Sequence, residues 1–557
     1  MRIFRTSYSV LISGAGIGGP ALAYWLARAG VEVTVVERAP APRPGGQAVD
    51  IRGAARDVVQ RMGLLSTIRS AGLEERGFAF VDEQGRHQAS MPVSFMGGEG
   101  IVAEIEILRG ELSRVLYEAT CADAEYLFDN SIDSLVQDDN GVHVTFVNGG
   151  SRRFDLVIGA DGVHSRVRSL AFGDGEAACV APLGGYTAYF TIPHRIDTND
   201  WFVIHNAPGG RAIGIRSGGP CATQVMLMFL SPSLGYERFE PARQKQILTR
   251  TFAGIGWEAP RVLDAMWDAS DFYFDLVAQV RMERWTRGRV ALLGDAACSP
   301  SPVTGLGTSL ALVGAYVLAG ELARSNGAHD AALPRYQSVM RDYVKQCQVL
   351  PPGGLEGILP RTSPAIWLRN MSMRIMTRWP VRGLVAGMFH RADAIVLDNY
   401  FASSLPEPAV AGSSWPDRFA ARTRARRRRR VMVKGAQYGF VRLQRQASGV
   451  SDQAPGASPE DRGLVSRIGP LEIDWPKSLG YYGGIGLAVA FELLEPPLAI
   501  FIAAVPVLKL LKNPGEPWPL RIAADVLEGA AKPVGGDAES TVRVAQGEPS
   551  GRQRKAQ

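Results

Sequence analysis

The sequence is poor in cysteine and lacks the usual motifs of metal-dependent and nucleophile enzymes. Its five cysteines, Cys121, Cys179, Cys221, Cys298 and Cys347, are odd in number and far apart among 557 residues. This pattern fits neither a disulfide framework nor a zinc-ligand pair, and it favours a reducing compartment. No H-E-x-x-H motif and no Ser-His-Asp set can be picked out. We therefore predict no metal site and assign no catalytic side chain.

An export signal is also missing. The apolar run 8–12 follows Arg2 and Arg5, but it is too short for the hydrophobic region of a signal peptide and leads directly into a glycine-rich turn. We predict that this run is a first β-strand and that the protein is cytoplasmic.

Positive charge is scarce outside one segment. The formal net charge is +6, but residues 422–430 alone contain seven arginines. The rest of the chain is close to neutral, so a nucleic-acid-binding surface is not indicated. With 46% hydrophobic and 21% charged residues the composition is globular, and the length predicts two to four domains at about 150 residues each.

What is present is a glycine-rich turn between a strand and a helix near the N-terminus. Gly14, Gly16 and Gly19 form G-x-G-x-x-G before a helical pattern over 20–30. Such glycines permit a tight bend, the approach of a pyrophosphate and close packing of helix on strand. Glu37 ends the next strand, where a carboxylate can accept hydrogen bonds from ribose hydroxyls. A carboxylate at this position favours FAD or NAD over NADP.

Two later stretches distinguish between these dinucleotides. In residues 155–169, DLVIGADGVHSRVRS, Asp161 and Gly162 follow a buried-strand pattern. In residues 288–322, which begin GRVALLGDAA, Asp295 follows a second buried-strand pattern. These stretches resemble the D-G and G-D fingerprints of the flavoprotein aromatic hydroxylases, and a plain NAD dehydrogenase needs neither.

Residues 1 to about 400 as a whole resemble a group A, single-component FAD-dependent monooxygenase of the aromatic-hydroxylase type. The resemblance implies an α/β fold, with a Rossmann-type, glutathione-reductase-like FAD-binding domain (1–178 and 282–402) and an inserted, mainly antiparallel β-sheet substrate domain (about 179–281). It implies bound FAD, with NADPH or NADH as a transient reductant. In this family hydride passes to flavin N5 and O₂ adds at C4a. The hydroperoxide then delivers oxygen to an aromatic, polyketide-like or quinone-type small molecule.

The resemblance also assigns cofactor-binding roles. Asp295 faces the ribityl chain, and the helix after Gly305 and Gly307 presents its N-terminal amides to the flavin, where they stabilise negative charge that develops on reduction. Gln47 lies in the loop beside the isoalloxazine ring, and Pro302 lies over that ring. The expected cofactor-binding residues are Gly14, Gly16, Gly19, Glu37, Arg38, Gln47, Arg109, Asp161, Gly162, Asp295, Pro302, Gly305, Gly307 and Thr308.

Two arginines have two interpretations each, and a third has one. Arg109 opens a helix at the place where the family uses an arginine to hold the cofactor, but ordinary surface arginines are common there. Arg38, beside Glu37, either touches the adenine or incoming dinucleotide or is solvated. Arg52, in the same loop as Gln47, is expected near the flavin.

Two places depart from the usual family pattern. Cys298 stands where the family usually has histidine, and Thr308 and Ser309 stand where a small residue and asparagine are usual. Because all three side chains are small, we expect FAD binding to persist, whereas their effect on flavin reactivity stays open.

The predicted substrate sheet offers no clear acid or base. His194 and His205 both lie there, but a lone histidine among apolar strands is more often structural, and we assign neither a role. The aromatic and apolar content of residues 185–230 suits a hydrophobic ring substrate, and it suits an ordinary sheet core equally well.

The character of the sequence changes near residue 403. Residues 403–465 predict a basic, flexible linker, residues 466–534 an apolar helical extension and residues 535–557 a disordered tail. Within the extension, residues 479–511 are longer than the about 20 residues that span a bilayer. Two glutamates and two prolines interrupt their middle.

Two hypotheses about this extension remain open. In the first, residues 479–511 form a helical hairpin in one membrane leaflet, and residues 422–430 attract anionic lipid at the inner face of the membrane. In the second, they form a soluble helical pair that docks on the catalytic region. A charge run is usually a solvated segment, so it does not decide between the two.

Three functions also remain open. The first is a hydroxylase that acts on a small molecule with O₂. The second is a flavin-dependent halogenase or a reductase of a prenyl-lipid substrate on the same fold, although the halogenase signature W-x-W-x-I-P is missing. The third is a non-catalytic flavin-binding, membrane-associated protein. The oligomeric state is not predicted.

Overall fold

The described residues of the chain fall into two units. The computed structural model describes residues 8–43, 45–93, 105–173, 179–219, 221–351, 353–376 and 394–401, and three short strands between residues 465 and 544. The described residues up to 401 belong to one compact unit, and the three short strands belong to a second.

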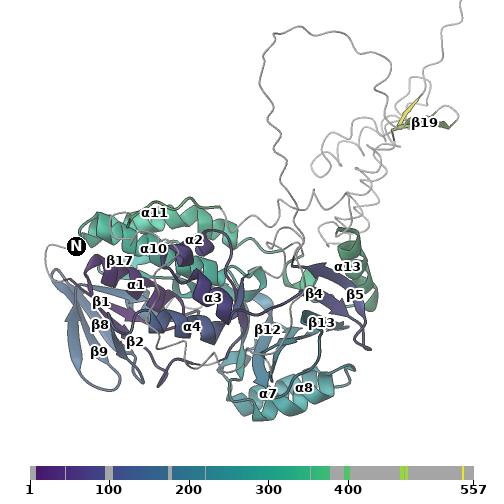
Figure 1. Cartoon of the computed structure of the whole chain (residues 1–557), viewed down its shortest axis with the longest axis horizontal. Coiled ribbons are helices and arrows are strands. Elements are labelled where there is room, and N and C mark those ends of the chain that lie inside the picture. Colours follow the sequence, from purple (N-terminus) through teal and green to yellow (C-terminus); the bar gives the residue numbers. More distant parts are fainter. Residues whose placement is uncertain are drawn as a thin grey trace, which may run out of the picture. The chain divides into compact units, whose positions relative to one another are not determined.

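A six-stranded, mainly parallel sheet forms one half of the first unit (Figure 1). Val10, Leu11 and Ile12 on its central strand are fully buried, as is typical of a parallel strand covered on both faces. In spatial order its strands are β17(Thr286–Arg287), β18(Val290–Leu292), β11(Leu156–Gly159), β1(Ser9–Ser13), β2(Glu32–Val36) and β7(Glu125–Leu127).

The three glycine motifs meet at one edge of this sheet. Strands β1, β11 and β18 are adjacent and parallel, with Ser13 opposite Gly159 and Gly159 opposite Leu292. Each motif follows the carboxyl end of one of these strands. Ligands of open α/β sheets bind outside this edge, so the topology alone brings the three motifs to one site.

Long helices pack on the parallel sheet. Helix α1(Gly18–Ala29) follows β1, and it packs against α10(Gly307–Arg324), which in turn packs against α11(His329–Cys347). Figure 1 shows α10 and α11 together along one side of this half. Because α10 is buried along most of its length, its start at Gly307 is held rigidly next to the glycine motifs.

A seven-stranded sheet forms the other half of this unit. Only the pair β13/β4 is parallel, and the other pairs are antiparallel. Helices α7(Pro241–Thr251) and α8(Ala259–Ala265) contribute to the hydrophobic core on one face. In spatial order the strands are β16(Tyr273–Val280), β12(Val180–Ile192), β15(Thr223–Leu230), β14(Arg211–Ser217), β13(Trp201–Ala207), β4(Gly77–Val81) and β5(His87–Pro92).

Smaller elements connect these halves. The ribbon β3(Ala48–Asp50)/β6(Glu106–Leu108) and helix α4(Arg109–Glu118) carry residues that the sequence places at the cofactor. The remaining elements of this unit are α2(Ala54–Arg61), α3(Leu65–Ala71), β8(Ile132–Asp138), β9(Gly141–Phe146), β10(Ser151–Phe154), α5(Arg166–Phe172), η2(Tyr236–Arg238), η3(Met266–Asp268), α9(Asp295–Cys298), η4(Pro302–Thr304), α12(Gly354–Ile358) and α13(Ser363–Met376).

The second unit contains a three-stranded antiparallel sheet of β19(Val465–Ile468), β20(Leu471–Asp474) and β21(Val542–Val544). The predicted linker up to residue 464, the basic run 422–430 and the apolar stretch 479–511 lie outside the described residues. Among the helices that are described, none is both long and apolar enough to cross a bilayer.

Candidate flavin site

The first glycine motif forms a turn in which two positions exclude any side chain. Gly14 has a φ of +108°, and a Cβ built there would lie 2.5 Å from the carbonyl oxygen of Ala160. A Cβ at Gly19 would overlap the carbonyl oxygen of Gly14. The Gly14 N–H donates to the carbonyl oxygen of Val36 at 2.8 Å. The turn therefore closes against β2 and β11, and α1 starts directly after it, where the pyrophosphate of a dinucleotide can bind.

Glu37 is held beside this turn. Its Oε2 accepts a hydrogen bond from the Ala15 N–H at 2.8 Å, and its Oε1 accepts one from the Ala39 N–H at 3.0 Å. Arg43 Nη2 lies 3.8 Å from Oε1. Arg38, the neighbour of Glu37, is exposed. Glu37 therefore occupies the place at the end of β2 that the sequence predicts for a ribose-binding carboxylate.

Arg109 projects from the start of α4 toward the glycine turn. Its Nη2 lies 3.2 Å from the position of a Cβ at Gly16, and its Cβ lies 3.5 Å from that of a Cβ at Gly46. Its backbone N–H donates to the carbonyl oxygen of Gln47 at 2.9 Å. The structure therefore brings Arg109, Gln47 and Gly16 together, although they come from three separate segments.

Asp161 and Gly162 shape the start of α5. The Asp161 carboxylate accepts hydrogen bonds from Ser165 Oγ at 2.5 Å and from the Val167 N–H at 3.0 Å. Gly162 has a φ of +86°, a conformation that favours glycine. Asp161 therefore organises its own loop through both of its oxygens.

A buried arginine links this second motif to the third. Arg168 is 2% exposed, and its Nη1 donates to the carbonyl oxygen of Ala296 at 3.0 Å. Ala296 lies in α9, which begins at Asp295. Burial raises the pKa of Asp295, whereas a hydrogen bond from Ser299 and the charge of Arg109 lower it.

The third motif ends at the start of α10. Asp295 Oδ1 lies 3.7 Å from the position of a Cβ at Gly307, the first residue of that helix. Gly305 has a φ of +66°, Pro302 is exposed and Thr308 is 7% exposed. An exposed proline next to a helix N-terminus fits the expected position over a planar ring, and that role stays a prediction.

The loop after Gln47 contains an ion pair that contacts the same helix start. Arg52 Nη2 lies 2.8 Å from Asp50 Oδ2, and both side chains are close to fully buried. Asp50 Oδ2 lies 3.0 Å from the position of a Cβ at Gly305, and Ser309 Oγ donates to the carbonyl oxygen of Arg52 at 3.3 Å. Ser309, one of the unusual positions, thus anchors the loop. Sequence reasoning did not find Asp50, because a single aspartate in a loop carries no signal.

The arrangement is that of a dinucleotide-binding site. Comparison with known proteins decides which dinucleotide it binds. A family model described as an FAD binding domain matches residues 7–348. Relatives named as flavin-dependent monooxygenases match the chain over most of their own length. This chain belongs to the FAD-dependent monooxygenases. FAD is therefore its cofactor, and the enzyme is an oxidoreductase.

For several relatives of this monooxygenase, the match covers most of the relative's own length. A flavin-dependent monooxygenase of Legionella longbeachae is 38% identical over 60% of this chain and 85% of its own length. The flavin-dependent monooxygenase eupH of a Phoma species is 35% identical over 74% of this chain and 98% of its own. The solved structure of tetracycline destructase Tet(51) is 33% identical, with a TM-score of 0.61 over 71% of this chain and all of its own.

The face of the seven-stranded sheet opposite α7 and α8 is apolar in this monooxygenase. Its buried cluster includes Phe78, Ile204 and Met228. Partly buried hydrophobic side chains packed against this cluster include Phe202, Met226, Val303 and Met373. Val303 belongs to η4, directly after Pro302, so this face meets the loop that is expected at the flavin.

The aromatic content of residues 185–230 is divided between the two faces of the sheet. Tyr186, Phe190 and Phe229 belong to the core on the side of α7 and α8, whereas Met226 and Met228 are on the flavin side. Alternation along each strand explains this division, because successive side chains point to opposite faces. Half of the residues that suited a ring substrate are therefore ordinary core.

Neither histidine of this region is positioned for proton transfer at the flavin. His205 is 5% exposed, and its Nδ1 lies 3.2 Å from the carbonyl oxygen of Val81. Its ring centroid lies 5.7 Å from that of Trp257. His194 follows β12, where Arg261 Nε donates to its Nε2 at 3.0 Å.

A polar chain that the sequence does not reveal lies next to the cofactor-binding residues. Tyr273 Oη donates to Asp275 Oδ2 at 2.5 Å, and His164 Nε2 lies 3.1 Å from Asp275 Oδ1. Burial and the charge of Asp275 raise the pKa of Tyr273, which also senses the charges of Arg109 and Asp295. His164 follows the second motif, whereas the other two residues of the chain lie on β16.

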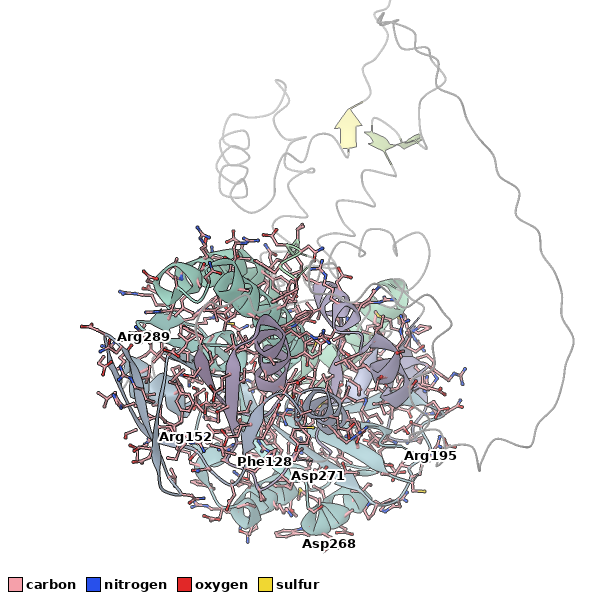
Figure 2. The ribbon with its side chains drawn as sticks, turned by 60° about the vertical axis from the view of Figure 1, so that its left-hand side comes forward. Phe128, Arg152, Arg195, Asp268, Asp271 and Arg289 are labelled. Atoms are coloured by element: carbon pink, nitrogen blue, oxygen red, sulfur yellow. The ribbon has the colours of Figure 1, made fainter. Side chains whose placement is uncertain are left out.

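Asp271, labelled in Figure 2, joins the segment before β16 to β12 and lies close to Gly45 in the loop before β3. It accepts hydrogen bonds from the Thr191 N–H at 2.8 Å and from Thr191 Oγ1 at 2.6 Å. Its Oδ2 lies 2.7 Å from the position of a Cβ at Gly45. Among the residues that the structure describes, no group of His, Cys, Asp or Glu side chains could hold a metal ion.

Proposed function

We propose that this monooxygenase uses NADPH or NADH and O₂ to hydroxylate an aromatic, polyketide-like or quinone-type small molecule. The observation that carries the proposal is the apolar sheet face, on which Phe202, Met226 and Met373 are only partly buried and, like Val303, pack against the buried cluster. Partly exposed hydrophobic side chains beside a cofactor loop are typical of a small-molecule site. A flat apolar substrate would bury them.

Polar groups border this apolar face and support a substrate that carries oxygen functions. Arg216 lies with its guanidinium 4.3 Å from the centre of the Phe202 ring. Gln224, directly opposite Arg216 on the neighbouring strand, is 6% exposed, and its Oε1 has no hydrogen-bond partner among the described residues. An oxygenated polycyclic ligand would supply donors and acceptors at this border.

The similarity to Tet(51) supports the same class of substrate. That protein is a tetracycline destructase, and the match covers its whole length. We propose that this chain likewise accepts polycyclic, polyketide-like compounds, and that the seven-stranded sheet acts as the substrate domain. This sheet extends the predicted range 179–281 by the strands β4 and β5.

FAD would supply the hydride acceptor and the activation of O₂, and the residues of this chain would bind and orient it. Glu37 would accept hydrogen bonds from the adenosine ribose, and the start of α1 with Arg109 would hold the pyrophosphate. Asp295 would bind the ribityl chain. The N–H groups at the start of α10 would stabilise negative charge at the flavin.

Mixing experiments on the purified, FAD-loaded full chain test this function. Oxidised flavin should be reduced by NADPH or NADH under anaerobic conditions, faster with a tetracycline or a hydroxylated anthraquinone present. Aerobic turnover should then add one oxygen atom to the compound, as measured by mass spectrometry. Reduction of a prenyl quinone without oxygen incorporation would support the reductase alternative, and flavin that stays oxidised with every reductant would contradict both.

Membrane association through residues 422–430 and 479–511 remains a separate prediction. Co-flotation of the full chain with vesicles that contain anionic lipid tests it. Protein that stays at the bottom of the gradient with anionic and neutral vesicles alike would contradict it.

A further inference from the structure

A buried group of charges joins the loop at the flavin to the seven-stranded sheet. Arg216 on β14 binds Glu75 through Nε at 2.8 Å and Nη2 at 2.6 Å, and it binds Glu106 on β6 through Nη2 at 2.6 Å. Their side chains are between 2% and 10% exposed. Asp50 and Arg52 form the neighbouring ion pair, beside Gly305.

Two carboxylate oxygens of this group lack partners. Asp50 Oδ1 and Glu106 Oε2 are buried and accept no hydrogen bond from any of the described residues. Asp50 and Glu106 lie directly opposite each other in the β3/β6 ribbon. Opposed residues of an antiparallel pair project from the same face, with Cβ atoms about 5 Å apart, and like charges there are destabilising. Two ionised carboxylates would leave both oxygens unsatisfied and mutually repelled.

We propose that Asp50 and Glu106 share one proton, and that this pair, which then carries a single negative charge and is clamped by Arg216, positions the flavin-side ribbon β3/β6 against the substrate sheet. An O–H on one carboxyl that donates to the free oxygen of the other satisfies both atoms at once. The proton also makes the number of negative charges in this buried group equal to the number of positive charges. Asp50, Glu75 and Glu106 would otherwise set three negative charges against the two positive charges of Arg52 and Arg216.

The surroundings of Glu106 favour its protonated form. Burial raises the pKa of Glu106 well above its usual range, Arg216 opposes this, and the Glu75 and Asp50 carboxylates add to it. Helices α3 and α4 also pack against β6. The charged residue of α3 is Arg69, which is exposed, and α4 begins at Arg109, whose guanidinium lies beside Gly16.

The shared proton matters for the cofactor because of where Asp50 lies. Asp50 Oδ2 is 3.0 Å from the position of a Cβ at Gly305, next to the N–H groups of α10 that serve the flavin. An excess negative charge at this point would compete with the cofactor for these donors. Glu106 is therefore a positioning residue that acts through Asp50 and Arg216. The existence of the shared proton does not depend on the proposed hydroxylation. Its role in positioning the substrate sheet does rest on that proposed function.

The sign of the pH dependence follows from the raised pKa. Above an unfolded pKa of about 4.3, folded Glu106 binds a proton that the unfolded chain has released. The free energy of unfolding therefore falls as the pH rises from this value through the folded pKa. Replacing Glu106 by glutamine keeps the neutral side chain and removes this slope.

The test uses the full-length, FAD-loaded protein and four variants. Glu106→Gln and Asp50→Asn remove the need for the shared proton, Glu106→Ala removes the link, and Glu118→Gln is the control because Glu118 is an exposed residue of α4. Infrared spectra at pH 8 should show a protonated-carboxyl band in the wild type and in Glu118→Gln that is absent in Glu106→Gln and Asp50→Asn. Urea unfolding between pH 5 and pH 9 should show the smaller pH slope in Glu106→Gln.

FAD titration provides a third readout. Glu106→Gln should keep the affinity for FAD within about twofold, whereas Glu106→Ala should lower it about tenfold, the equivalent of one lost buried hydrogen bond. The proposal is overturned if Glu106→Gln keeps the band and the wild-type slope, or if both neutral variants fail to fold. These readouts need no substrate, so an inactive hydroxylase would not affect them.

Discussion

The two sheets of the first unit build their sites by different means. At the edge of the parallel sheet the decisive positions are glycines and backbone groups. They follow β1, β11 and β18, which are neighbours in the sheet. On the seven-stranded sheet the decisive positions are side chains, such as Arg216 and Met226, from strands that become neighbours only by pairing. A site made of backbone groups needs particular residues at particular spacings. A site made of side chains on a sheet needs only that successive residues of each strand point to opposite faces. Motifs therefore mark the cofactor half, and nothing equivalent marks the substrate half.

The largest expected effect tests whether backbone sterics govern the cofactor half. Gly14→Ala should abolish FAD binding and lower the free energy of unfolding by about 3 kcal/mol, because the new Cβ meets the Ala160 carbonyl at 2.5 Å. Gly149→Ala is the control, since Gly149 has a φ of +84° but nothing within 4 Å of its Cβ position. It should cost about 1 kcal/mol. Urea unfolding and flavin absorbance measure both variants, and equal losses would refute the steric explanation.

Removal of Arg109 tests the contribution of a long side chain to the cofactor half. Arg109→Ala should raise the dissociation constant for FAD about 30-fold, the equivalent of about 2 kcal/mol for lost hydrogen bonds to a charged group. Arg114→Ala is the matched control on α4, because Arg114 is exposed and pairs with Glu111 and Glu118. Titration of the FAD-free protein, followed by flavin fluorescence, distinguishes the two. Similar affinities in both variants would mean that Arg109 is an ordinary surface arginine.

A smaller effect is expected on the substrate half. Met226→Ala should weaken the binding of tetracycline, used as a probe, about fivefold, or about 1 kcal/mol, because it removes apolar contact area. FAD affinity should not change. Leu234→Ala, at a side chain that is 52% exposed, is the control. Perturbation of the flavin spectrum by tetracycline reports binding, and a Met226 variant that loses FAD instead would remove the distinction between the two halves.

The smallest effect concerns thiol reactivity in the cofactor half. Burial raises the pKa of Cys298, whose Sγ donates to the carbonyl oxygen of Gly294. At pH 8 an aromatic disulfide reagent should therefore label exposed Cys121 and Cys221 but leave Cys298 unlabelled until the protein unfolds. Peptide mapping identifies the labelled sites. Labelling of Cys298 in the folded protein would show that this region opens.

The sequence was enough to predict FAD and the monooxygenase family, and the comparisons confirm both. Glu37 lies beside the Gly14 turn and Arg109 beside Gly16, as the predicted roles require, and these roles stay predictions. Asp161 accepts hydrogen bonds within its own loop, and its predicted cofactor role also stays a prediction. Tyr273 and Asp275 could not have been predicted, since their link to His164 crosses 111 residues.

By itself, the sequence determined where a dinucleotide can approach the backbone. Gly14, Gly16 and Gly19 stand at a fixed spacing and Glu37 follows within one βαβ unit, so this pattern is local and can be recognised in the linear sequence. Only the tertiary structure decided what faces the flavin from the other side. Asp50 and Glu106 meet because β3 pairs with β6, and Arg216 reaches Glu106 from the separate seven-stranded sheet. Burial then gives their charges an energy that no spacing in the chain encodes.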